Sequence, residues 1–151
     1  DTYLDRAVTY ARMGQNDLAI KDYDHAYKLK PNNQKLLENR AYTYLYAVAN
    51  YAAAIADYNT LIAIDPTNME YYKNRGLAKL NSGKSKDSME DFSRVLNANP
   101  KDKDCLYYMS FAYKVLKSYP EAIGYAEKAQ QYGYKLPAGY MEGLEKPTSA
   151  K

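Results

Sequence analysis

The residues of this chain that could carry out chemistry are few and scattered. Its one histidine, His25, and its one cysteine, Cys105, lie far apart in the sequence, without the spacing of a metal site. No glycine-rich phosphate-binding loop is present. We therefore expect no catalytic centre, no metal and no cofactor, and we expect the chain not to be an enzyme.

Acidic residues do recur, but one at a time. Three arginines and three aspartates repeat with the same period, as Arg6 and Asp22, Arg40 and Asp57, and Arg75 and Asp91. Acid–base catalysis by paired carboxylates needs two of them in one place, whereas these aspartates are about 34 residues apart. A fourth copy has Met109 and Tyr125 in the corresponding positions, so the charges are present together and absent together. The pattern predicts three structural ion pairs, each between the two helices of one repeat.

The elements that position these residues also repeat. Three similar sequence segments end at Pro31, Pro66 and Pro100, which are 35 and 34 residues apart. A fixed period in this range is typical of stacked supersecondary units that cannot bury their apolar faces alone. Apolar residues at helical spacing, interrupted by glycine and polar breaks, predict two helices in each unit. The expected helices lie near residues 2–13, 17–30, 34–47, 51–64, 68–81, 85–97, 103–117 and 119–131.

We expect a single repeat domain over residues 1–145. Its four repeats span about residues 1–33, 34–68, 69–102 and 103–134. A short capping segment is predicted at about 136–145, because Tyr140, Met141 and Leu144 have helical spacing, and residues 146–151 are expected to form a flexible tail. Since Asp1 is predicted to fall inside the first helix, we expect the chain to be part of a larger protein.

Composition argues against two classes of partner. The net charge is +3, and charges of both signs are interspersed, which does not favour nucleic acid. The longest mainly apolar stretch, 42–56, is interrupted by Asn50 and is rich in tyrosine, so we expect no direct membrane insertion. A soluble domain is expected, cytoplasmic or periplasmic, because one cysteine leaves the redox compartment open.

Taken together, the recurring residues resemble the tetratricopeptide repeat family. Its pattern is a large residue, a small one and Tyr in the first helix, then small, aromatic, small and Pro in the second. The small slots hold Ala7, Ala41, Gly76 and Ser110, then Ala19, Ala54, Ser88 and Ala122. Lys79 departs from the tyrosine slot, and Tyr134 departs from the last proline slot. The resemblance implies an all-α fold, a right-handed α-solenoid of antiparallel helix pairs whose first helices line a concave groove.

An unusually apolar and aromatic set of side chains is predicted to face that groove. Large exposed apolar patches usually mark interaction sites, and tyrosine is enriched among binding hot spots. Asn39 and Asn74 share one slot, and some relatives use asparagines there to hold the backbone of a peptide. The alternatives are that the capping segment covers some rings and that the amides are ordinary surface groups. The predicted groove residues are Leu4, Val8, Asn39, Tyr42, Tyr46, Lys73, Asn74, Leu77, Tyr107 and Phe111.

The leading prediction is a non-catalytic module that binds a peptide or a partner helix in its concave groove. One alternative is a structural spacer or assembly module of a multidomain protein, such as a cell-envelope protein. Another is the targeting domain of an enzyme whose catalytic part lies elsewhere. Relatives that clamp the acidic tails of cytosolic chaperones need a set of Lys, Asn and Arg residues, of which only Asn39 is present when the slots are read from the first repeat. We therefore expect this chain not to be a chaperone acidic-tail clamp.

Overall fold

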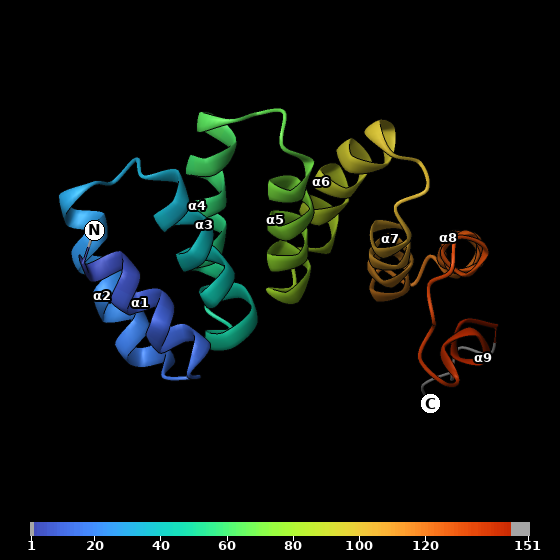
Figure 1. Ribbon diagram of the computed structural model, residues 1–151. Helices are drawn as coiled ribbons and strands as arrows, with labels where there is room; N and C mark the ends of the chain where they lie inside the picture. The colour runs from blue at the N-terminus through green and yellow to red at the C-terminus, as the bar shows by residue number, and fades with distance from the viewer. Residues whose placement is uncertain (1, 146–151) are drawn as a thin grey trace. The chain divides into compact units, whose positions relative to one another are not determined.

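The computed structural model describes residues 2–145, and this part of the chain consists of helices joined by turns (Figure 1). The first five elements are α1 (Thr2–Arg12), α2 (Asn16–Leu29), α3 (Gln34–Thr43), the π-helix η1 (Tyr44–Val48) and α4 (Tyr51–Ile64). They are followed by α5 (Met69–Asn81), α6 (Ser85–Ala98), α7 (Lys103–Val115), α8 (Tyr119–Gln131) and α9 (Tyr140–Glu145). The predicted all-α fold is confirmed, and the predicted flexible tail at 146–151 lies outside the described residues.

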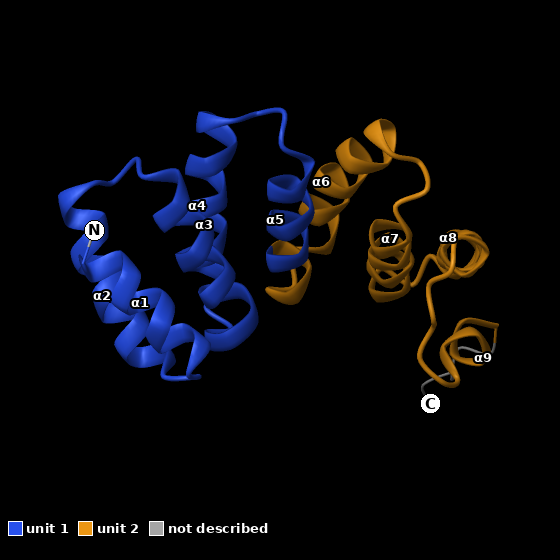
Figure 2. Cartoon of the chain, viewed as in Figure 1, with its two compact units in different colours: residues 1–78 blue, residues 79–151 orange. Residues whose placement is uncertain are grey.

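The chain forms two compact units (Figure 2). The first comprises residues 1–78, and the second comprises residues 79–151. The boundary falls inside α5, between Ala78 and Lys79. A single domain over residues 1–145 stays a prediction, and each unit is described by itself below.

In the first unit, small residues let paired helices pack closely. Ala7 and Ala19 are fully buried where α1 meets α2, and Ala41 and Ala54 are fully buried where α3 meets α4. A methyl group in these positions leaves room for the backbones to approach, so the larger side chains fill the remaining space at crystal-like density. The largest fully buried side chain in this cluster is Tyr23.

The second unit has an apolar cluster of its own. Ala122 and Ala126 of α8 pack against Tyr140 and Leu144 of α9, and all four are buried. The hydroxyl of Ser110 donates to the carbonyl of Ala122 at 2.7 Å and lies 3.0 Å from the Tyr140 hydroxyl. The segment after α8 therefore folds back onto the repeat that precedes it.

The turn inside each helix pair contains a residue with positive φ. These residues are Gly14, Ala49, Gly83 and Lys117, with φ of 72°, 56°, 82° and 60°. Glycine adopts this conformation without cost, whereas other residues meet steric strain there. The recurrence shows that the turn geometry is common to the copies, although only two of them carry the residue best suited to it.

Candidate functional site: an exposed aromatic pair beside a cavity

Two tyrosines stand out on the surface of the first unit. Tyr42 on α3 and Tyr46 in η1 are one helical turn apart, a spacing that places side chains on one face. Their ring centroids are 4.5 Å apart at a tilt of 40°, and the residues are 59% and 51% exposed. The Tyr46 hydroxyl donates to Oδ1 of Asn74 at 2.8 Å. The two rings thus form an ordered apolar surface that the first unit does not bury.

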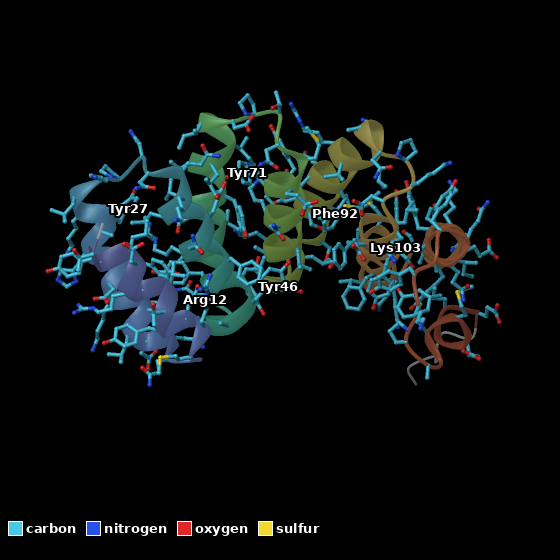
Figure 3. All side chains as sticks on the ribbon, viewed as in Figure 1. Arg12, Tyr27, Tyr46, Tyr71, Phe92 and Lys103 are labelled. Carbon is cyan, nitrogen blue, oxygen red and sulfur yellow. The ribbon has the colours of Figure 1, made fainter. Side chains whose placement is uncertain are left out.

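Beside this pair lies a cavity of about 300 Å³. Three of the predicted groove residues line it, namely Val8, Asn39 and Tyr42. The other lining residues are Ala11, Arg12, Asn16, Tyr23, Thr43 and Ala47. Figure 3 shows Arg12 on α1 and Tyr46 after α3, which mark the two elements that flank the site. The repeat pattern therefore predicts part of the cavity wall but not the cavity.

Tyr23 brings a buried polar group to the cavity. The hydroxyl of Tyr23 is buried and has no hydrogen-bond partner among the described residues. Burial raises the pKa of Tyr23, while the nearby Thr43 and Arg12 act in the opposite direction. The Thr43 hydroxyl donates its hydrogen to the carbonyl of Asn39 at 2.8 Å, so it does not donate to Tyr23. Since Thr43 and Arg12 both line the cavity, the hydroxyl end of Tyr23 is the end that faces it.

The π-helix η1 explains one wall of the cavity. The second repeat is one residue longer than its neighbours at this turn, and a π-helix accommodates such an insertion without breaking the helix. The turn ends at Ala49 with φ of 56°, and the Asn50 side chain then caps α4 by accepting from the amide of Ala53 at 3.2 Å. Ala47, inside the π-helix, reaches the cavity as a result. The extra residue was the sequence signal for this feature.

The structure corrects the prediction for Leu4. This residue was expected to face the groove, but it is only 4% exposed and belongs to the core cluster of the first unit. The physical reason is that α1 contacts α3 as well as α2, so the side of α1 that carries Leu4 is covered. Leu4 is therefore a core residue.

The remaining predicted groove residues of the first unit are half-buried. Lys73 makes an ion pair with Glu70 at 2.7 Å, and Leu77 packs against the core cluster. The Asn39 amide nitrogen donates to the carbonyl of Lys35 at 2.7 Å. Asn39 and Asn74 are thus each held by one hydrogen bond within the first unit, which fixes how their amides are oriented.

In the second unit, the predicted groove residue Tyr107 is covered by the chain's own C-terminal segment. Its ring stacks on that of Tyr134, with centroids 4.4 Å apart, and lies 5.4 Å from the ring of Tyr140. Phe111, one turn further along α7, remains 37% exposed. Burial raises the pKa of Tyr107, and it raises that of Tyr140 to about 12. Tyr107 therefore fits the alternative interpretation, in which the C-terminal segment covers a ring that would otherwise face the groove.

The recurring charges lie between the helices of a pair. Arg6 donates to both carboxylate oxygens of Asp22, at 2.6 and 2.8 Å, and lowers the pKa of that carboxyl. Arg40 donates to both oxygens of Asp57, at 2.8 and 2.7 Å. Arg40 also donates a hydrogen bond to Asp24 at 2.9 Å. Because Asp24 lies on α2 and Arg40 lies on α3, this bond links the first repeat to the second. Burial raises the pKa of Asp57, although Arg40 opposes the rise.

The third recurring pair has a different set of described contacts. Arg75 donates to Asn59 at 2.8 Å, and Asp91 forms an ion pair with Lys79 at 2.8 Å. Lys79 is the residue that departs from the tyrosine slot, and its ammonium supplies a charge partner for the aspartate. The pairing of Arg75 with Asp91 stays a prediction.

Residues 2–145 lack two kinds of feature, one chemical and one related to membranes. This part of the chain holds no cluster of three or more His, Cys, Asp or Glu residues that could bind a metal ion. Within it, no helix combines the length and the apolar character needed to cross a bilayer.

Comparison with known families identifies the repeats. A family profile described as tetratricopeptide repeat matches residues 1–33, and one described as TPR repeat matches residues 50–83. This chain is a tetratricopeptide repeat protein. The two matched segments contain α1 with α2 and α4 with α5, so they include both helices of the first pair.

Curated relatives share part of the chain. RNA polymerase II-associated protein 3 of Mus musculus is 33% identical over 91 residues, which cover 60% of this chain and 14% of that protein. Small glutamine-rich tetratricopeptide repeat-containing protein 2 of Saccharomyces cerevisiae is 33% identical over 81 residues, 54% of this chain and 23% of that protein. Serine/threonine-protein phosphatase 5 of Rattus norvegicus is 28% identical over 112 residues, which cover 74% of this chain and 22% of that protein. The matched region thus spans less than a quarter of each relative.

Solved structures of MamA share the fold. MamA MSR-1 matches with a TM-score of 0.81 at 21% identity, covering 86% of this chain and 74% of that one. MamA from Desulfovibrio magneticus RS-1 matches with a TM-score of 0.74 at 16% identity, and the match covers 98% of this chain and 76% of that one. This likeness shows a fold of stacked helix pairs. Fold and family together support a protein-interaction or scaffold module.

Proposed function

We propose that the first unit binds a segment of a partner protein at the surface formed by Tyr42, Tyr46 and the adjoining cavity. The observation that carries this proposal is the pairing of two tyrosines, 59% and 51% exposed, beside a cavity of about 300 Å³. Tyrosine offers a large apolar area with few rotatable bonds, so burying it against a partner costs little side-chain entropy. Exposed rings next to a pocket are typical of binding hot spots.

The two asparagines complete the surface. Asn39 uses its amide nitrogen within the unit, and Asn74 uses its oxygen. The Asn39 oxygen can accept from a backbone N–H, and the Asn74 nitrogen can donate to a backbone carbonyl. We propose that these two atoms hold the main chain of the bound segment while the tyrosines and the cavity hold its side chains.

In the second unit, we propose a supporting role for the covered aromatic cluster around Tyr107. Its ring is used inside the unit, because Tyr134 stacks on one face of it and the ring is half-buried. The spacer function considered from the sequence thus suits this cluster, while Phe111 remains a candidate contact because it is 37% exposed.

The test uses a partner captured with the intact chain. Tyr42→Ala is expected to weaken capture by about 2 kcal/mol, roughly thirty-fold in affinity, because the exposed ring contributes contact area to the partner. Tyr132→Ala is the matched control, since Tyr132 is 37% exposed and belongs to the second unit. Equal capture by the parent and by Tyr42→Ala would refute the proposed surface.

A further inference from the structure

Of the residues from 2 to 145, Arg12 is the one charged residue that lines the cavity of the first unit. Among the described residues it has neither an ion-pair partner nor a hydrogen-bond partner for its guanidinium. No carboxylate in the described part of the chain lines the cavity to neutralise it. An arginine that is free in this way presents its fork of N–H donors to whatever enters, and that fork matches a carboxylate.

Tyr23 provides a second, independent observation. Its hydroxyl is enclosed at the cavity and has no hydrogen-bond partner within residues 2–145, and the Thr43 hydroxyl beside it donates its own hydrogen to the Asn39 carbonyl. An unsatisfied buried hydroxyl destabilises a folded protein, so such groups are rare and usually have a reason. A ligand oxygen that arrives between Arg12 and Tyr23 would satisfy both donors.

The size and the walls of the cavity limit what it can hold. A volume of about 300 Å³ is at the lower end of the range for ligand pockets, which suits one or two side chains rather than a large cofactor. Val8, Ala11 and Ala47 provide apolar walls, and the Tyr42 ring forms a further side. The occupant should therefore combine an apolar body with an acceptor oxygen.

We propose that this cavity takes an acidic side chain of the bound partner segment, together with an apolar side chain next to it. The carboxylate accepts from the Arg12 guanidinium and from the Tyr23 hydroxyl, and the apolar neighbour packs against Val8 and the Tyr42 ring. This inference rests on the proposed function, because it specifies the sequence of the segment that the first unit binds. The carboxylate belongs to a side chain inside the segment and not to a chain terminus.

The experiment begins with selection. Short random peptides, displayed on phage by fusion of their C-termini to a coat protein, are selected on the intact 151-residue chain. The expected result is enrichment of Asp or Glu next to a large apolar residue. Selection on the Arg12→Glu chain is expected to replace the acidic residue by Lys or Arg at the same position, because the charge at the cavity is reversed.

Affinities of the best selected peptide then test the pairing. Arg12→Gln is expected to weaken binding about ten-fold, and so is exchange of the peptide's acidic residue for its amide. Combining both changes should cause little further loss, because they remove the same interaction. Lys21→Gln, at an exposed lysine of α2 outside the cavity, is the control and should bind like the parent.

Tyr23→Phe separates a ligand contact from a purely structural role. Removal of an unpaired buried hydroxyl should raise the thermal midpoint, whereas loss of a donor to the carboxylate should weaken peptide binding several-fold. A lower midpoint, or unchanged binding, would overturn the part assigned to Tyr23.

The outcomes for the two proposals are distinct. If the peptides lose binding with Tyr42→Ala but carry no acidic preference that follows the charge of Arg12, this inference is overturned and the proposed function stands. If no peptide is enriched, or the enriched peptides bind Tyr42→Ala as they bind the parent, both are overturned.

Discussion

The two units use surface aromatic rings in opposite ways. In the first unit, Tyr42 is 59% exposed and borders a cavity. In the second, Tyr107 is stacked under Tyr134 and packs beside Tyr140. Both tyrosines lie on the side of a first helix that the repeat pattern assigns to the groove. The difference teaches that the segment following a repeat decides whether such a ring stays exposed or becomes part of the interior.

The interiors of the units differ as well. Arg40 joins Asp24 and Asp57 between the helices of the first unit. The fourth repeat has Met109 and Tyr125 in the slots of the arginine and the aspartate, with Met109 buried and Tyr125 stacked on Tyr113. One architecture thus accommodates either a charged link or an apolar contact between paired helices.

The largest expected effect concerns the charged link. Arg40→Met should lower the free energy of unfolding by about 3 kcal/mol, because it leaves the buried Asp57 without its partner. Adding Asp57→Leu should recover most of that loss, since the pair then resembles the apolar arrangement of the fourth repeat. Urea unfolding followed by circular dichroism measures both variants.

Lys21→Met is the matched control for Arg40→Met, because Lys21 is exposed in the same unit. Its free energy of unfolding should stay within about 0.5 kcal/mol of the parent. If the double variant is as unstable as Arg40→Met, the two slots do not tolerate an apolar pair and the comparison with the fourth repeat is wrong.

The next effect tests the covered ring against the exposed one. Tyr107→Ala should destabilise the protein by about 2 kcal/mol, because it removes a half-buried ring from a packed aromatic cluster. Tyr42→Ala should change stability by less than about 0.5 kcal/mol. The same urea experiment compares them, and equal losses would mean that Tyr42 is also part of the interior.

A smaller effect concerns the hydrogen bonds through which Ser110 of α7 contacts α8 and α9. Ser110→Ala removes the bond to the Ala122 carbonyl and the contact with the Tyr140 hydroxyl. The expected loss is about 1 kcal/mol, typical of one buried hydrogen bond. Hydrogen exchange should then become faster in Tyr140–Glu145 and stay unchanged in the first unit. Faster exchange in both units would show that they unfold together.

The smallest effect is a pH dependence in the first unit. Arg6 lowers the pKa of Asp22 below its ordinary value, so the charged carboxyl stabilises the folded state above the unfolded pKa of about 3.9. This contribution is lost as the pH falls through the lower folded pKa. The difference in stability between the parent and Asp22→Asn should therefore shrink on acidification below about pH 4. A difference that grows instead would mean that the pKa is raised.

Much of the fold follows from the sequence, because close helix packing needs small residues at fixed positions. Ala7, Ala19, Ala41 and Ala54 recur for that reason and are fully buried. Leu4 was assigned wrongly, since its burial depends on a contact between α1 and α3 that helical periodicity does not encode.

The site was harder to predict than the fold. The exposed pair was found because Tyr42 and Tyr46 lie opposite the packing slots. The sequence offers the cover over Tyr107 only as an alternative, since the chain beyond Gly133 no longer follows the repeat. The unpaired Tyr23 hydroxyl could not be foreseen, because its slot normally calls for an apolar aromatic ring and its partner depends on three-dimensional packing.

The central claim is that the Tyr42 and Tyr46 surface of the first unit recognises a partner, and nitration of tyrosines tests it most directly. The chain has 19 tyrosines, so mass spectrometry can compare many sites in one experiment. Without a partner, Tyr42 should react readily and the fully buried Tyr23 should not. With a captured partner bound, Tyr42 should become protected while Tyr132 stays reactive. Protection of Tyr132 with no change at Tyr42 would contradict the account.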